Sequence, residues 1–528
     1  MGAYDGLPRE EPEIAARAKA VGIALLVVSL ASRAADLNLC TPAGCAAVML
    51  PESLGSVLAA YPLSEDTAAR IEDGFALNGD EVIPPHDPAA RLQIPIGVGL
   101  LPRATAMSFG SEGRAQVEQR DGRLVLDCAA GSQPAGVLIR LAGRGLPQGA
   151  ALSASARFQS TGNFGLGASD TRRSKAGDPL PLGTLSARPL ELPATLDWNT
   201  LESFTVSCPS RAGRLELSEL AIQPNGKRPA PRRALWARPA QSWMNDAAAL
   251  LAKAERAGAD TLFVTVPVME GSVEQPQRLA EFVSAANARR VAIWAVLGDP
   301  RAVTPDGQAQ LSKVAAAFDA YNRSAAPAAK LAGVQYDIQP YLNPGYAAAP
   351  EAWQEAYLAT LQELRQQAAL PVDVAIPFWW NDPALLEPLA EYVDSITVMD
   401  YRTDPLAIRS LAQPFLDWGA QHGRRVRIAL EYGPIPDRTH RHYRPAQEGD
   451  VALVSASGTP ALVKLAERRP AAPPIERVYQ QSHDTIAPGR NITFAGQREA
   501  LLKITTELEQ LWSAWPGFAG IALHGFEP

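Results

Sequence analysis

The sequence predicts an α/β protein in which a C-terminal (β/α)₈ TIM barrel follows an all-β, jelly-roll-like sandwich. Eight apolar, strand-like runs lie after residue 233, and segments with helical periodicity separate most of them. Parallel strands that are covered by helices have this pattern. Between residues 113 and 224, short runs with partial alternation are separated by Gly, Pro, Ser or Asn, which is typical of a sandwich.

The expected barrel strands lie in the runs ALWAR (234–238), TLFVTVPV (261–268), RVAIWAVL (290–297), LAGVQYDI (331–338), VDVAIPFWW (372–380), SITVMDY (395–401), RVRIALEY (425–432) and GFAGIALHGF (517–526). An open, doubly wound sheet is the competing fold. The count of eight runs and the lack of a Gly-rich phosphate turn after the first run favour the barrel. A long stretch at about 434–495, which contains Pro, Arg and His, is expected as an insertion before the last strand.

Composition changes divide the rest of the chain. Residues 113–224 are assigned to the sandwich and 233–528 to the barrel. PNGKRPAPRR (224–233) predicts a linker, assigned to 225–232, because its prolines cannot donate to a β-ladder and its charges need water. Residues 36–112 form a segment of unclear fold.

The N-terminus predicts export. Arg17 and Lys19 precede an apolar run from Val21 to Ala31, which is shorter than the roughly 20 residues of a membrane-spanning helix. Residues 1–35 are therefore expected to be a signal peptide or a membrane anchor, and a buried helix is the alternative. The expected location is periplasmic, extracellular, or anchored in the inner membrane and facing the periplasm.

Charge and cysteine content narrow the partners and the compartment. The net charge is −7 over 528 residues and no long basic run occurs, so nucleic acid is not expected as a partner. An exported chain could hold its four cysteines as two disulfides, Cys40–Cys45 and Cys128–Cys208. Buried free thiols are the alternative.

The candidate functional residues stand where the expected barrel strands end, since the C-terminal ends of the strands form the active-site face of such barrels. Carboxylates beside aromatic rings suit carbohydrate chemistry, because the rings stack on sugars and the carboxylates transfer protons or stabilise charge. The catalytic candidates are Asp337, Gln339, Asp400, Tyr401 and Glu431, and the substrate-binding candidates are Trp236, Tyr341, Trp380, Arg402, Tyr432, His524 and Glu527.

Structural roles are alternatives for several of these residues. Asp337 could be a buried carboxylate paired with Arg238 or Arg402, and Glu431 could be a solvated charge at a strand end. Trp379 and Trp380 are adjacent, so one of them is expected to pack against a helix, and Trp380 is chosen as the sugar platform. His440-Arg441-His442 has no third ligand nearby in the sequence, and neither a metal nor a cofactor is expected.

Two motifs carry a resemblance to a known family. GVQYDIQPY (333–341) resembles the fourth-strand motif DGxDxDxE of chitinase-like (family 18) glycoside hydrolases, and VMDYR (398–402) resembles their MxYD. The resemblance covers only the barrel. It implies that Asp337 orients the catalytic group and the substrate N-acetyl, and that Tyr401 steadies the bound intermediate. The sandwich, through the stretch that follows Trp198, loosely resembles carbohydrate-binding modules.

The sequence departs from the family pattern at three positions. Gln339 stands where the family has its general-acid Glu, Arg402 where it has Asp, and Gln335 replaces the first acid of the motif. An amide cannot donate a proton as a general acid, a function that typically contributes about 10²–10⁴-fold. The barrel could bind glycans without cutting them, could use another pair such as Asp337 and Glu431, or could carry a deliberate Glu-to-Gln change.

The sequence therefore predicts a glycoside-hydrolase-like protein acting on O-glycosyl bonds of an extracellular or cell-envelope polysaccharide, with catalysis impaired through Gln339. The alternative is a non-catalytic carbohydrate-binding subunit of a polysaccharide synthesis or secretion system. Its partners would be the polysaccharide and, for such a subunit, the envelope export machinery.

Overall fold

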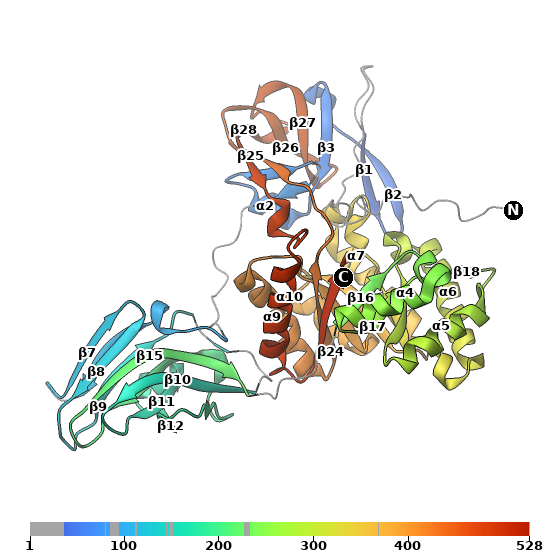
Figure 1. Cartoon of the computed structure of the whole chain (residues 1–528). Coiled ribbons are helices and arrows are strands. Elements are labelled where there is room, and N and C mark those ends of the chain that lie inside the picture. The colour runs from blue at the N-terminus through green and yellow to red at the C-terminus, as the bar shows by residue number, and fades with distance from the viewer. Residues whose placement is uncertain are drawn as a thin grey trace.

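The computed structural model describes residues 36–528 except 80, 85–93, 95, 111–112, 144, 147–150, 226–232, 368 and 527–528. The expected signal peptide or anchor at 1–35 and the candidate Glu527 lie outside the described residues. Figure 1 shows three units: the sandwich, the barrel, and a smaller β-sheet whose strands come from both ends of the sequence. No helix among the described residues is long and apolar enough to cross a membrane.

The C-terminal unit is a closed barrel of eight strands in which neighbouring strands run parallel. Each strand overlaps one of the predicted runs, so the closed barrel is confirmed and the open sheet is excluded. In order around the barrel the strands are β16 (Arg233–Ala237), β17 (Ala259–Val264), β20 (Ala292–Leu297), β21 (Gly333–Tyr336), β22 (Val372–Pro377), β23 (Ser395–Met399), β24 (Arg425–Glu431) and β29 (Phe518–His524).

Helices connect the barrel strands, and several begin at a local sequence signal. Thr304, Asp382 and Asp404 each cap a helix whose first residue is proline, and each side chain accepts a backbone N–H bond. Such caps satisfy donors that the first turn leaves unpaired. The helices are α4 (Gln241–Ala257), α5 (Pro276–Ala288), α6 (Pro305–Ser324), α7 (Pro350–Gln367), α8 (Pro383–Tyr392), α9 (Pro405–His422) and α10 (Arg498–Trp512).

The sandwich consists of two five-stranded sheets, ordered β13-β10-β15-β8-β7 and β12-β11-β14-β9-β6. Leu126, Ile139 and Phe204 lie in its buried core. The strands are β6 (Thr105–Gly110), β7 (Ala115–Arg120), β8 (Arg123–Cys128), β9 (Ala135–Arg140), β10 (Leu152–Ser160), β11 (Gly165–Asp170), β12 (Leu180–Thr184), β13 (Leu190–Glu191), β14 (Leu201–Ser207) and β15 (Gly213–Pro224), with α3 at Thr171–Ala176.

The sandwich begins earlier than the predicted boundary at residue 113. Strand β6 pairs with β9 along its whole length, and the Gly97 amide donates to the Ile222 carbonyl at 2.8 Å. The sequence TAMSFG of β6 carries few large apolar side chains, so its periodicity gives no clear strand signal.

The third unit, which we call the composite sheet, contains strands from residues 36–112 and from residues 434–495. The sequence predicted these two segments as separate parts of the chain, and this prediction is wrong. Strands from both segments form one seven-stranded sheet in the order β3-β27-β26-β28-β25-β4-β5. In Figure 1 the N-terminal strand β3 lies beside β27 of the insertion. The strands are β3 (Val57–Pro62), β4 (Phe75–Asn78), β5 (Glu81–Ile83), β25 (Arg438–Pro445), β26 (Glu448–Ala456), β27 (Thr459–Pro470) and β28 (Ile475–Ala487), with α2 at Glu65–Arg70.

The composite sheet is attached to the barrel at the end where β24 terminates. The Phe494 amide donates to the Glu431 carbonyl at 2.9 Å, and the Ser64 amide donates to the Ala347 carbonyl in the loop between β21 and α7 at 2.9 Å. The insertion and the N-terminal segment therefore both contact the rim that holds the C-terminal ends of the barrel strands.

All four cysteines are paired, and both predicted disulfides are confirmed. Cys40–Cys45 closes the hairpin of β1 (Asp36–Thr41) and β2 (Gly44–Met49). Cys128 ends β8 and Cys208 follows β14, so this bond joins the two sheets of the sandwich.

The inter-sheet disulfide is expected to stabilise the fold more than the hairpin disulfide does. The Cys128→Ser/Cys208→Ser variant should lose about 4 kcal/mol of unfolding free energy in urea denaturation, because the bond closes a long loop in the unfolded chain. The matched Cys40→Ser/Cys45→Ser variant opens a much shorter loop and should lose only about 2 kcal/mol. Equal losses in the two variants would contradict this account.

Asp417 on α9 makes a pH prediction. The Trp515 Nε1–H donates to its carboxylate at 2.7 Å, and burial raises the pKa of Asp417 to about 7. The folded state then holds a proton that the unfolded state releases above its ordinary pKa, so stability should fall as pH rises from about 4 to about 7. Asp417→Asn should remove this loss and be more stable than the parent by about 1–3 kcal/mol at pH 8 but not at pH 4. If Asp417→Asn differed from the parent in stability by the same amount at pH 4 and at pH 8, Asp417 would be excluded as the cause of the pH dependence.

Candidate functional site

Asp337 is the centre of a polar cluster at the C-terminal end of β21. The Arg238 guanidinium, which follows β16, forms an ion pair with its Oδ2, and the Gln339 Nε2–H donates to its Oδ1 at 2.8 Å. The Asp337 side chain is only 2% exposed. The structure shows Asp337 as a buried carboxylate paired with Arg238, and its catalytic role stays a prediction.

Both ends of the Gln339 amide are used. Its Nε2–H donates to Asp337, and its Oε1 accepts the hydroxyl of Tyr341 at 2.9 Å. A glutamate at this position would bring two carboxylate oxygens together with no proton between them unless one acid were protonated. The cluster as built therefore requires a donor at position 339, which an amide supplies.

Glu431 ends β24 and is fully buried, so it is not a solvated charge at a strand end. The Gly433 amide donates to its Oε1 at 2.6 Å, and His524 Nδ1 lies 2.8 Å from its Oε2. A Cβ at Gly433 would lie 2.9 Å from Oε1. Only glycine at 433 allows the backbone to approach the carboxylate so closely.

Tyr401 joins the two halves of the site. Its ring stacks on the His524 ring, with the two centroids 6.0 Å apart. The Trp236 and His524 rings pack edge to face, with their centroids 5.5 Å apart. Burial raises the pKa of Tyr401, the charges of Glu431 and Asp337 raise it further, and Arg238 opposes them. The structure thus brings Asp337, Gln339, Tyr401 and Glu431 to one end of the barrel, and their functional roles stay predictions.

A buried polar layer supports this end from below. Gln335 Oε1 accepts the Trp236 indole N–H at 2.7 Å, and Gln335 Nε2 donates to Asp373 at 2.8 Å. Thr397 and Ser395 donate to the same carboxylate. Burial raises the pKa of Asp373, and Arg427 opposes that effect. Gln335 therefore holds Trp236 through hydrogen bonds in the lower layer, although alternation puts it on the same strand face as Asp337.

The choice of Trp380 as the sugar platform is wrong. Trp380 is 2% exposed, donates to the Tyr346 hydroxyl at 3.2 Å and packs against Tyr357 of α7. Trp379 is the exposed tryptophan, with 41% of its surface accessible. Its ring packs edge to face with Tyr341, with the two centroids 5.4 Å apart. Strand β22 ends at Pro377 and the Trp380 amide closes a turn onto the Pro377 carbonyl, so alternation does not apply to these two residues.

Asp400 is buried next to Tyr401 but takes no part in the cluster. Neither of its carboxylate oxygens has a hydrogen-bond partner among the described residues. Burial raises the pKa of Asp400 well above its usual value, with Arg402 opposing. Burial of this kind favours the protonated carboxyl, and the catalytic role of Asp400 stays a prediction.

The other substrate-binding candidates lie at the same end. Arg402 lies over the Phe378 ring at 4.4 Å, and the half-buried Tyr432 meets Phe526 edge-on at 5.3 Å. Glu527 lies outside the described residues. The sequence did not single out Gly433, whose only signal is its position directly after the strand-ending EY pair.

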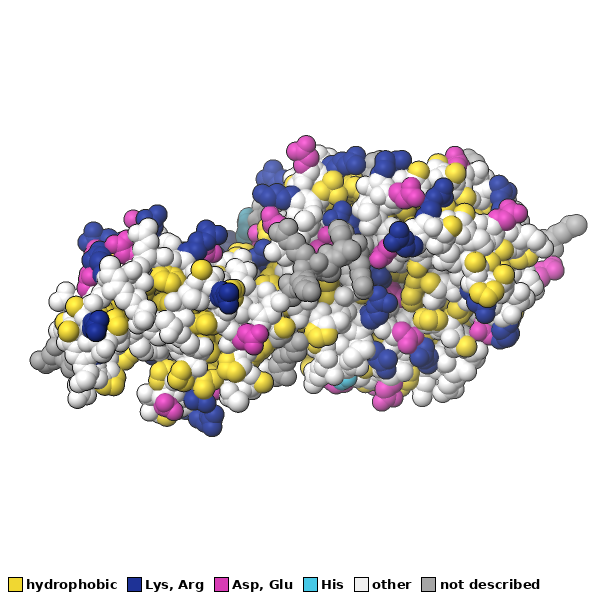
Figure 2. Space-filling model, turned by 60° about the horizontal axis from the view of Figure 1, so that its bottom comes forward, with side chains coloured by type: hydrophobic (Ala, Val, Ile, Leu, Met, Phe, Trp, Pro, Cys, Tyr) yellow, Lys and Arg dark blue, Asp and Glu magenta, His cyan; other side chains and the backbone are white. Residues whose placement is uncertain are grey.

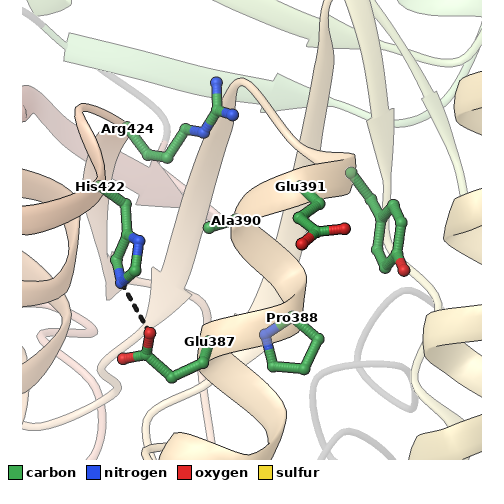
Figure 3. Close-up of a pocket in the computed structure, with 7 residues that line it drawn as sticks. Glu387, Pro388, Ala390, Glu391, His422 and Arg424 are labelled. Carbon is green, nitrogen blue, oxygen red and sulfur yellow. Dashed lines mark ion pairs between the residues drawn. The ribbon is translucent and has the colours of Figure 1, made fainter.

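A separate cavity of about 620 Å³ lies at the opposite end of the barrel, lined in part by Glu387, Glu391, His422 and Arg424. Figure 3 shows the ion pair of His422 with Glu387, whose atoms are 3.1 Å apart. Glu387 and Glu391 lie on α8, His422 ends α9, and Arg424 directly precedes β24, so the cavity holds none of the candidate residues. In the part of the chain that the structure describes, no three His, Cys, Asp or Glu side chains are grouped to hold a metal ion.

No family model matches the chain, and no curated protein sequence matches it. Similar solved structures include the CBM22-1–GH10 modules of endo-1,4-beta-D-xylanase 10B from Clostridium thermocellum (9% identity, 63% of this chain and 81% of that chain, TM-score 0.26). They also include a GH18 chitinase from Pseudoalteromonas aurantia (12% identity, 38% of this chain and 80% of that chain, TM-score 0.28). A third is the spore cortex-lytic enzyme SleL from Bacillus cereus (10% identity, 59% of this chain and 75% of that chain, TM-score 0.32).

These are the kinds of protein that the sequence motifs resemble: glycoside hydrolases, among them family 18 chitinases, and a hydrolase with a carbohydrate-binding module. Identities this low concern the fold alone. With TM-scores between 0.26 and 0.32, these likenesses show no activity of this chain.

The Arg238–Asp337 pair makes a testable prediction. Arg238→Met should cost about 2–3 kcal/mol of unfolding free energy, because it leaves a buried carboxylate without its charge partner. Asp337→Asn should cost less, because Arg238 is partly exposed and can be solvated. The double variant should be no less stable than Arg238→Met alone. Additive losses in this double-mutant cycle would show that the two residues do not stabilise each other.

Proposed function

We propose that the protein binds an extracellular or cell-envelope polysaccharide through the C-terminal face of its barrel and does not cleave it by the family 18 route. The observation that carries this proposal is the doubly hydrogen-bonded amide of Gln339. The residue at the general-acid position has no proton to give, and its neighbours are arranged around an amide.

The side chains at this face suit a sugar chain. Trp379 presents an exposed ring, and aromatic faces stack on the C–H surfaces of sugars. Arg238 and His524 are partly exposed and offer N–H groups that can donate to hydroxyls. A glycan could therefore stack on Trp379 and accept hydrogen bonds from Arg238 and His524 while the buried layer beneath them stays unchanged.

The proposed location is outside the cytoplasm. Two disulfides support it, because such bonds persist in oxidising compartments and are rare in cytosolic proteins. The signal-like N-terminal residues motivate the same proposal.

Hydrolysis by Asp337 and Glu431 is the second candidate. It is favoured by the fixed orientation of the buried Glu431, which accepts from Gly433 and contacts His524. Glu431 would attack the anomeric carbon while Asp337 gave its proton to the leaving oxygen, and water would then release the sugar. The hydrogen bonds of Asp337 count against this route, because both of its carboxylate oxygens already accept N–H bonds, from Arg238 and from Gln339.

The test compares the parent with Gln339→Glu, Glu431→Gln and Trp379→Ala. Binding to a panel of bacterial exopolysaccharides is measured by calorimetry, and cleavage is measured as release of reducing ends. We expect the parent to bind without cleavage, and Trp379→Ala to bind about 10-fold more weakly because it loses a stacking platform. Phe158→Ala, in the sandwich, is the matched aromatic control and should bind barrel ligands as the parent does.

The outcomes separate the candidates. Cleavage by the parent that Glu431→Gln abolishes would replace binding with the Asp337–Glu431 route. Cleavage by Gln339→Glu alone would show that position 339 is the acid site and that its amide blocks catalysis. If the parent neither binds nor cleaves any glycan in the panel, the proposal is wrong.

A further inference from the structure

Arg402 forms no ion pair with any acid among the described residues. It follows β23 directly, and its guanidinium lies 4.4 Å from the centre of the Phe378 ring. Its NH1 donates to the Tyr401 carbonyl at 2.8 Å. Within the described ranges, no carboxylate forms an ion pair with it.

The nearby acid Asp400 forms no ion pair or hydrogen bond with Arg402. Its charge would favour that of Arg402, but burial raises the pKa of Asp400 well above the usual value, which favours its neutral form. Burial lowers the pKa of Arg402, but a guanidinium stays protonated in proteins because its pKa starts so high. A half-buried cation without a carboxylate partner is costly, and a ligand anion would offset that cost.

The other charges of the site are already engaged. Asp337 is paired with Arg238, and Glu431 is held by Gly433 and His524. An incoming anion would therefore meet carboxylates that are buried and bonded, and the guanidinium of Arg402 would be the group left to receive it.

A continuous row of side chains leads from Arg402 to the Asp337 cluster. The ring centroids of Phe378 and Trp379 are 5.0 Å apart, and those of Trp379 and Tyr341 are 5.4 Å apart. The Tyr341 hydroxyl donates to Gln339. The row follows the ends of three neighbouring strands, β23, β22 and β21. A sugar stacked on the exposed Trp379 would have Arg402 on one side and the Asp337 cluster on the other.

We propose that the site selects glycans that carry carboxylates, with Arg402 binding the carboxylate of a uronic acid residue stacked on Trp379. This inference rests on the proposed function, because it names the class of polysaccharide bound at the same face. Arg402 is the specificity residue, since a guanidinium can bind a carboxylate through two parallel hydrogen bonds.

The test uses pairs of ligands that differ only in charge. Oligosaccharides of galacturonate and of alginate are titrated by calorimetry beside their methyl esters, which keep the backbone and lose the charge. The parent should bind the acids at least 10-fold more tightly than the esters, and the difference should shrink as salt is added. Arg402→Gln should bind the acids about 10- to 100-fold more weakly, as expected for loss of a charge-assisted bond, with ester binding unchanged.

Two further variants complete the design. Arg402→Lys should recover part of the affinity for the acids, because it restores the charge but not the two-bond geometry. Arg425→Gln is the matched control: Arg425 is an exposed arginine at the opposite end of the barrel, where β24 begins, and the change should leave binding as in the parent. Circular dichroism and thermal melting confirm that each variant is folded.

The possible results separate this inference from the proposed function. Equal affinity for acids and esters, or undiminished binding of the acids by Arg402→Gln, would overturn the uronate inference and leave glycan binding standing. Binding of neutral exopolysaccharides but of none of the acids would do the same. Failure to bind any glycan, charged or neutral, would overturn both.

Discussion

Closure of eight parallel strands into a barrel is the constraint on which the site depends. Alternate side chains of every strand must share one interior, and each polar group there needs a partner because water is excluded. Gln335 and Asp373 satisfy one another in a lower layer, while Asp337 is satisfied by Arg238 and Gln339 above it. The polar face of β21 therefore serves two purposes, since its first amide supports the barrel and its later residues form the site.

The same constraint explains why an amide at position 339 fits so well. An amide donates from one end and accepts at the other, so it can join a carboxylate to a hydroxyl in a single chain of bonds. The cost is the loss of a proton donor at the position where the family 18 pattern has one. Stability of this cluster and general-acid chemistry at 339 are thus opposed, because the group that best satisfies Asp337 is one that cannot protonate a leaving group.

The composite sheet shows how an insertion can depend on a distant part of the chain. Strands β25–β28 have an outer neighbour on each side, β4 and β3, that comes from the N-terminal segment. Edge strands with open N–H and C=O groups invite unwanted pairing, and these partners cover them. The arrangement also brings both segments to the rim of the candidate site. On the face drawn in Figure 2, basic side chains are interspersed with acidic ones.

The sequence by itself determined the eight barrel strands and the strand ends at which Asp337, Tyr401 and Glu431 stand, because periodicity and local motifs are properties of short segments. It could not show that β3 pairs with β27, since strand pairing leaves no local signal. It also misjudged Trp380, because alternation fails where a strand turns, and it could not separate a buried Glu431 from a solvated one. Burial and ion pairing, including the lack of an ion pair at Arg402 among the described residues, were decided only by the tertiary structure, because each depends on which distant residues the closed barrel brings together.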